Sequence, residues 1–505
     1  MAFEPIAVLG RGCALPGALS PRALWMAVAQ GADLTSDPEP EDWGLPPSLV
    51  IARARDGAQI DKTWGGRGGY VRAFADVWDP DGFGVSPAEL DGLDKGVLWL
   101  LHAARQAWTE GRGEARNPAR TGAVIGNLSY PSRGLSNFAH AVWRNARNHA
   151  GFRPENRFVS GFPAHLLAKA FSLGGPAFAL DAACASSLYA IKHACDLLHA
   201  RQADAMLVGA VNACDNLFLH MGFTALGALS KSGRSSPLSR SADGLLPAEG
   251  AAAVLLVRAC DVDPARDNVL GVIRSVGVSN DGRRRGLLAP DGGGQREALD
   301  RAYGAAGIAP QTVSLIECHA TGTPTGDPLE IATLAEVFAD APDLPVGSLK
   351  SNTGHLITAA GLGGLLKLLG GLEHETRPPT INAEDSLATF EQGPVRPLLA
   401  AETWPRGATP RRAGLSAFGF GGNNAHLVLE EWTPDRKSVF MPTRACDPDT
   451  DEIVICGVGA SAGDAAGLTA ILASLEAPPP DTPHPRRESV TVDLARVKQP
   501  PRDLD

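Results

Sequence analysis

Short apolar runs, separated by loops that contain glycine and proline, recur along the whole chain. Runs of strand length lie at or within residues 5–10, 121–127, 205–212, 241–257, 269–279, 313–327, 345–361 and 411–431. Between them, residues 97–108, 296–306 and 362–372 are predicted to form helices, the first and last of them strongly apolar. Strands that alternate with helices predict an α/β fold, with parallel sheets covered by helices on both faces.

One stretch, residues 176–200, joins an apolar run of strand length to a helical pattern. Residues 176–180 form the run, and from Ala185 apolar side chains recur every three or four positions. Cys184 lies at the joint among alanines and serines, where small neighbours leave room for a substrate. Unpaired N–H groups and the dipole at a helix N-terminus favour a thiolate, the better nucleophile. The alternative interpretation is a small buried hydrophobic residue.

Two histidines follow predicted strands and precede loops of small residues. His319 lies in E-C-H-A-T-G-T and His355 in K-S-N-T-G-H. A cysteine with histidines distant in sequence is the pattern expected for an activated thiolate and its acid–base partners. Two acidic residues in apolar surroundings, Asp243 and Glu249, are interpreted as structural hydrogen-bond acceptors.

Composition narrows the class of protein. The chain has 505 residues, of which 44 % are hydrophobic, and its net charge of −10 argues against nucleic-acid binding. None of its eight cysteines forms a C-x-x-C pair, which argues against structural zinc. The N-terminus lacks the pattern of a signal peptide, and the longest apolar run, 251–257, is too short to cross a membrane. Glycines at 10, 12 and 17 do not match the dinucleotide-binding spacing. We therefore expect a soluble protein of a reducing compartment.

Several motifs resemble those of the β-ketoacyl synthases, in order and spacing. They are D-A-A-C-A-S-S-L, E-C-H-A-T-G-T-P-T-G-D, K-S-N-T-G-H and G-F-G-G-N-N-A-H, and the resemblance covers residues 4–431. The chain looks most similar to ketosynthase domains of multidomain polyketide and polyunsaturated-fatty-acid synthases. Ala182 and Asn423 stand where threonine is common, and L-D-K-G-V-L-W replaces a common D-P-x-x-R. None of these departures removes a catalytic group.

The resemblance implies a thiolase-type fold, in which two similar α/β halves form a five-layered αβαβα core. The halves are expected at residues 1–260 and 261–431. Residues 432–505 are expected to hold a linker and the start of a following ketosynthase-like segment, as in a longer synthase. The family also implies a homodimer, a cytoplasmic location and acyl carrier protein as partner. No metal or organic cofactor is expected, because substrates travel on the phosphopantetheine of the carrier.

The resemblance also implies roles for single residues. Cys184 would attack an acyl thioester and hold the acyl chain. His319 and His355 would donate hydrogen bonds to the malonyl thioester carbonyl and stabilise the enolate formed as carbon dioxide leaves. Lys350 would orient the two histidines. The N–H of Phe420 would join that of Cys184 in an oxyanion hole, and the ring of Phe420 would gate the acyl pocket. Thr321 and Thr323 would hold the pantetheine arm.

The predicted reaction is thus a decarboxylative Claisen condensation that yields a 3-oxoacyl carrier protein. Two alternatives share the fold: a non-catalytic subunit of the chain-length-factor kind, and a decarboxylase or acyltransferase variant. Both normally lack the nucleophile, so the presence of Cys184 favours the condensing enzyme. A degradative thiolase would show a second reactive cysteine. Cys318 precedes His319 directly, so in a strand it would point to the opposite face.

Overall fold

The computed structural model describes residues 3–52, 61–143, 153–157, 160–282 and 289–433, with short pieces between 455 and 473. The chain divides into two units, Met1–Thr443 and Arg444–Asp505. The described part of the second unit contains two short strands, β14 (Ser461–Ala462) and β15 (Ala465–Ala466), paired antiparallel. Most of the predicted linker and of the predicted ketosynthase-like segment lies outside the described residues, so both stay predictions.

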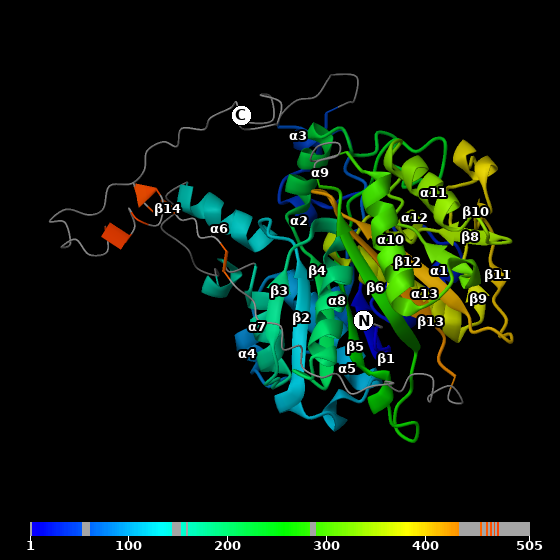
Figure 1. Cartoon of the computed structure of the whole chain (residues 1–505). Helices are drawn as coiled ribbons and strands as arrows, with labels where there is room; N and C mark the ends of the chain where they lie inside the picture. The colour runs from blue at the N-terminus through cyan, green and yellow to red at the C-terminus, as the bar shows by residue number, and fades with distance from the viewer. Residues whose placement is uncertain are drawn as a thin grey trace. The chain divides into compact units, whose positions relative to one another are not determined.

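The first unit contains one eleven-stranded sheet. Its strands are β1 (Ile6–Ala14), β2 (Thr121–Asn127), β3 (Ala177–Leu180), β4 (Ala205–Asn212), β5 (Gly250–Arg258), β6 (Gly271–Asn280), β7 (Leu315–Glu317), β8 (Leu344–Gly347), β10 (Val395–Pro397), β12 (Arg412–Phe418) and β13 (Asn423–Glu430). Their order is β10-β8-β7-β12-β13-β6-β1-β5-β4-β2-β3 (Figure 1). β9 (Thr376–Arg377) and β11 (Glu402–Thr403) pair separately. All of the predicted strand segments are confirmed.

The helices of this unit connect and cover the strands. They are α1 (Pro21–Ala29), α2 (Pro40–Trp43), α3 (Pro47–Val50), α4 (Pro87–Leu90), α5 (Lys95–Glu110), α6 (Arg133–Trp143), α7 (Phe162–Ala170), α8 (Ser186–His199), α9 (Asn216–Ala225), α10 (Gly292–Ala306), α11 (Gly326–Val337), α12 (Lys350–Thr353) and α13 (Ala360–Glu373). The predicted helices at 97–108, 296–306 and 362–372 are confirmed as parts of α5, α10 and α13. Within the described part of the chain, no helix is long and apolar enough to cross a membrane.

The prediction of parallel sheets is wrong for the middle of the sheet. β2 pairs in parallel with β3 and β4, and β7 pairs in parallel with β8 and β12. The pairs β4–β5, β5–β1, β1–β6, β6–β13 and β13–β12 are antiparallel. Only residues 419–422 connect β12 to β13, which is too short for the crossover that a parallel pair needs.

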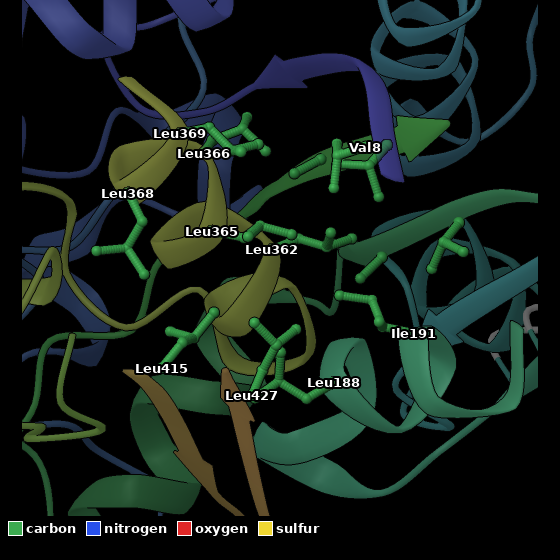
Figure 2. Close-up of a cluster of buried hydrophobic side chains, with 14 of the residues drawn as sticks. Val8, Leu188, Ile191, Leu362, Leu365, Leu366, Leu368, Leu369, Leu415 and Leu427 are labelled. Atoms are coloured by element: carbon green, nitrogen blue, oxygen red, sulfur yellow. The ribbon is translucent and has the colours of Figure 1, made fainter. Parts of the chain in front are cut away.

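Two helices, α8 and α13, lie between the two halves of the sheet. Their apolar side chains pack in one cluster with strand residues of both halves, among them Val8 and Leu427 (Figure 2). Helices α5 and α7 cover the outer face of the β2–β4–β5 half. Helices α10 and α11 cover the outer face of the β7–β12 half. The succession helix, sheet, helix, sheet, helix confirms the predicted five-layered thiolase-type fold, with the β1–β6 pairing joining the two halves.

The glycines of β1 serve close packing. A Cβ atom on Gly10 would lie 2.0 Å from the carbonyl oxygen of Ala107, and one on Gly12 would lie 1.9 Å from that of Ala103. Both carbonyls belong to α5, so the missing side chains let this helix rest directly on the strand. This contact accounts for the glycine pattern without a nucleotide.

Replacing Gly12 with alanine should therefore destabilise the protein. We expect Gly12→Ala to lower the free energy of unfolding by about 2–3 kcal/mol, because α5 must move away from β1. Gly304→Ala is the matched control: this exposed glycine lies in α10 with no atom within 4 Å of the added Cβ, so alanine should add about 0.5–1 kcal/mol. Urea unfolding of both variants tests this, and equal midpoints would contradict the packing argument.

Candidate active site

The turn that carries Cys184 is fixed by its own hydrogen bonds. β3 ends at Leu180, and Cys184 lies in a short 3₁₀ turn, η6 (Ala183–Ala185), directly before α8. The hydroxyl of Ser186 accepts from the N–H of Ala182 (2.8 Å) and donates to the carbonyl of Ala183 (2.6 Å). Ala183 has a φ of 50°, in the left-handed region that non-glycine residues rarely adopt. The predicted strand-to-helix joint is confirmed and holds the sulfur in one position.

The structure brings Cys184, His319 and His355 together. His319 follows β7, and His355 follows α12 after Gly354, whose φ is 76°. Nε2 of His355 lies 3.1 Å from Sγ of Cys184. The two imidazole rings are 5.4 Å apart between centroids and nearly perpendicular, at 81°. Three segments that are distant in sequence thus meet at one point, as the motifs predict.

Glu330 of α11 holds the backbone that carries His319. Its carboxylate accepts hydrogen bonds from the N–H groups of His319 (2.8 Å) and Ala320 (2.7 Å). The ammonium group of Lys350, which is buried, lies 3.4 Å from the carbonyl oxygen of Cys318. Lys350 therefore supports the histidine segment through its backbone. Sequence analysis missed Glu330, although it closes the run T-G-D-P-L-E after the His319 motif.

Two further buried carboxylates, those of Glu317 and Asp327, lie close to Glu330 and Lys350. Glu317, at the end of β7, forms a buried ion pair with Lys367 of α13 (2.7 Å) and accepts from the N–H of Leu349 (2.6 Å). Asp327 accepts from the N–H groups of Thr321 (3.0 Å) and Leu238 (2.9 Å). These carboxylates satisfy backbone donors that would otherwise be buried without partners. They fix the loops on which the predicted substrate-binding threonines lie.

Burial sets the protonation of the three central groups. It lowers the pKa of His319 and of His355 well below the ordinary value, and the positive charge of Lys350 lowers both further. It raises the pKa of Cys184 to about 11, although the N–H groups of Phe420 and Cys184 and the charge of Lys350 act in the opposite direction. The histidines are therefore neutral at pH 7, and the sulfur is a thiol.

The expected thiolate at the helix N-terminus is thus wrong for the resting protein. A helix end contributes about 0.3–1 kcal/mol, less than one pKa unit. Cys184 is only 2 % exposed, and loss of hydration outweighs that contribution. Nε2 of His355, 3.1 Å from the sulfur, is placed to accept the thiol proton.

Two cavities meet at Cys184. The first, of about 300 Å³, is lined by His319, His355 and the threonines at 321 and 323, whose hydroxyl oxygens lie 3.3 Å apart. The second, of about 460 Å³, is mostly apolar and is lined by residues such as Phe223 and Ile357. Cys184 and Phe420 line both cavities. The ring of Phe420 is 37 % exposed and packs against Phe223 at 6.0 Å, so it borders both spaces beside the sulfur.

The remaining predicted positions have structural roles. Cys318 lies one residue beyond the end of β7 and not in the strand, and it is fully buried in the apolar cluster of α10, α11 and the adjacent strands. Asp243 accepts from the hydroxyl of Ser230 (2.7 Å). Glu249 accepts from the N–H of Val71 (3.0 Å) and pairs with Lys95 (2.6 Å). The prediction that both acidic residues are structural acceptors is confirmed.

Comparison with known families agrees with this arrangement. The family model for the β-ketoacyl synthase N-terminal domain matches residues 3–261, and that for the C-terminal domain matches residues 270–384. The chain belongs to the β-ketoacyl synthase family. Ketosynthases of this family are acyltransferases that form carbon–carbon bonds.

Curated relatives are polyketide synthases. One phenolphthiocerol/phthiocerol polyketide synthase protein of Mycobacterium tuberculosis is 34 % identical over 480 residues, which cover 91 % of this chain and 24 % of that protein. The PKS-NRPS hybrid synthetase ATPKS of Aspergillus niger is 34 % identical over 444 residues, which cover 85 % of this chain and 23 % of that protein. The ketosynthase chain spans about a quarter of the length of these relatives.

Solved structures of ketosynthases share the fold. PfaC Keto synthase-Chain length factor superposes with a TM-score of 0.85 at 34 % identity, covering 94 % of this chain and 52 % of that chain. An oxazolomycin ketosynthase domain of Streptomyces albus superposes with a TM-score of 0.76 at 29 % identity, covering 85 % of this chain and 76 % of that chain. Both likenesses extend over most of the ketosynthase described above.

The pKa of Cys184 predicts how its alkylation depends on pH. Because only the thiolate reacts, we expect the rate of iodoacetamide modification to rise about tenfold per pH unit from pH 7 to 9. Peptide mass mapping at Cys184 measures this rate, with Cys184→Ala as the blank. A rate that levels off near neutral pH would show that the helix end outweighs burial.

The pKa of Glu330 predicts a pH-dependent difference in stability. Burial raises it to about 7, so the folded state favours the protonated acid, and its stabilisation is lost as pH rises from about 4.5 through 7. Between pH 5 and 8 the wild type should lose on the order of 2 kcal/mol relative to Glu330→Gln, which does not titrate. Urea unfolding of both proteins at both pH values measures the difference. A constant difference would mean that Glu330 is ionised throughout.

Proposed function

We propose that this ketosynthase catalyses decarboxylative Claisen condensation of a Cys184-bound acyl chain with malonyl-carrier protein. The observation that carries the proposal is the 3.1 Å contact between Sγ of Cys184 and Nε2 of His355, with His319 beside them in the same cavity. One group holds the acyl chain and two neutral groups face the space where an enolate forms. The product is a 3-oxoacyl carrier protein, made for polyketide or polyunsaturated-fatty-acid synthesis.

Acylation starts from the thiol. His355 Nε2 accepts the proton of Cys184 as the sulfur attacks the thioester carbonyl of an acyl carrier protein. The N–H groups of Cys184 and Phe420 face the sulfur and stabilise the oxyanion of the tetrahedral intermediate. The carbon–sulfur bond to pantetheine then breaks, and the leaving thiolate takes the proton back from His355. The acyl chain remains on Cys184 and extends into the apolar cavity beside Phe420.

Condensation uses both histidines as hydrogen-bond donors, His355 in the tautomer that carries its proton on Nε2. The malonyl arm lies in the first cavity, held by the hydroxyls of Thr321 and Thr323. As the carbon–carbon bond to the carboxylate breaks and carbon dioxide leaves, His319 and His355 stabilise the enolate oxygen. The enolate carbon attacks the acyl carbonyl, and the sulfur of Cys184 leaves as a thiolate, which takes up a proton from the solvent to restore the thiol. Lys350 and Glu330 act by positioning the His319 segment.

The proposed partners follow from the same site. Acyl carrier protein supplies both thioesters, and the cysteine and histidines meet the chemical needs of the reaction without a metal or organic cofactor. Strand β3 is the edge of the sheet, and Phe178 on it is 38 % exposed, which suits edge-to-edge pairing in a homodimer. We also propose that the ketosynthase works together with other domains of a longer synthase and that it is located in the cytoplasm. The three intact catalytic groups argue against a chain-length-factor or decarboxylase role.

The test mixes the purified ketosynthase with acyl-carrier protein and malonyl-carrier protein and records intact masses. We expect 3-oxoacyl-carrier protein with the wild type and none with Cys184→Ala. A Cys184 that is never acylated would overturn the proposal in favour of a non-catalytic role.

Removal of either histidine should slow condensation strongly. We expect His319→Ala and His355→Ala each to lower the rate by about 10²–10³-fold, as loss of one oxyanion donor does elsewhere. His374→Ala is the matched control, because this exposed histidine lies at the end of α13 and outside both cavities. Product formation by intact mass measures all three. A histidine variant with the control's rate would remove that residue from the mechanism.

A further inference from the structure

The donor atoms of Cys184, His319 and His355 form a compact group. One ligand atom from each residue lies within 4.8 Å of the other two, and the Cys184–His355 pair is 3.1 Å apart. In a tetrahedral zinc site with one sulfur and two nitrogen ligands, the donor atoms lie about 3.3–3.6 Å apart. Small side-chain rotations therefore reach the geometry of a three-ligand metal site. A fourth position remains open toward the cavity that Thr321 and Thr323 line.

Neither histidine is tied to a single tautomer. Nδ1 of His319 and Nδ1 of His355 are buried and have no hydrogen-bond partner among the described residues. No acceptor in that part of the chain therefore fixes the tautomer, and either ring can place its lone pair on the nitrogen that faces the sulfur. The donor set of one thiolate and two imidazoles suits Zn²⁺.

The surrounding charges and the missing outer contacts limit the affinity. Lys350 faces the group with a positive charge, which Glu330 and Glu317 oppose, while Glu317 is also paired with Lys367. Metal-binding histidines usually donate their second N–H to a partner, and loss of that contact costs about 10–100-fold in affinity. These features are those of a reversible metal site and not of a permanently bound structural ion.

We propose that Cys184, His319 and His355 bind Zn²⁺ reversibly, and that bound zinc inhibits acylation. The thiol proton of Cys184 is released, a zinc–sulfur bond forms, and water from the cavity occupies the fourth position. The sulfur lone pair that would attack a thioester is then held by the metal. Binding depends on the geometry alone, whereas its inhibitory effect rests on the function proposed above.

Cobalt(II) is the probe for binding. The reduced full chain is treated with chelator and titrated with Co²⁺, and we expect the near-ultraviolet thiolate–cobalt band and the visible bands of tetrahedral cobalt. Zn²⁺ should displace the cobalt. Cys184→Ala should lose the thiolate band, and His319→Ala or His355→Ala should weaken binding at least tenfold. Cys260→Ser is the matched control, because this half-buried thiol lies elsewhere and should leave the titration unchanged.

A second measurement needs no variant. Zn²⁺ should protect Cys184 from iodoacetamide, and a chelator should restore its reactivity. A cobalt band that survives in Cys184→Ala, or one that disappears in Cys260→Ser, would overturn the site. Binding without any effect on acylation would overturn the inhibition. If the wild type is never acylated but still binds cobalt through Cys184, the proposed function fails and the metal site stands.

Discussion

The burial of Cys184 and His355, with the partly exposed His319 beside them, is the constraint on which the rest of the site depends. Burial keeps both histidines neutral and keeps the sulfur protonated, so neither a permanent ion pair nor a free thiolate forms. It also requires that every nearby backbone donor find an acceptor, which explains the buried carboxylates Glu317 and Glu330. Those carboxylates in turn require the buried lysines that face them. The polar network is therefore a consequence of burying the reactive groups.

The helices that form the middle layer also position the reactive groups. α8 begins two residues after Cys184, and α13 begins five residues after His355. The two helices approach closely, since a Cβ atom on Gly361 would lie 2.6 Å from the hydroxyl of Ser187. Their leucines and Ile191 fill the cluster between the two halves of the sheet (Figure 2). The same packing that stabilises the fold thus sets the distance between nucleophile and histidine.

The sequence predicted the features that depend on local pattern. Apolar periodicity located α5, α10 and α13, and small residues around Cys184 located the turn before α8. Strand direction was wrong at β12–β13, because the pattern of a single strand does not show how long its connection is. The predicted protonation state of Cys184 was also wrong, because the burial that keeps its sulfur protonated comes from segments far away in the chain. Glu330 was missed for the same reason: its hydrogen bonds to the His319 segment follow from how α11 packs. Two expectations from the resemblance stay predictions: that condensation needs no metal or organic cofactor, and that Thr321 and Thr323 hold the pantetheine arm.

The position of Phe420 has a consequence for the order of events. A rigid ring that borders both cavities cannot shift without changing the room available in each. Under the proposed function, an acyl chain in the apolar cavity would press on this ring, and the room left in the cavity lined by His319 and His355 would change with it. Occupancy of one cavity would then be coupled to the space in the other through one side chain.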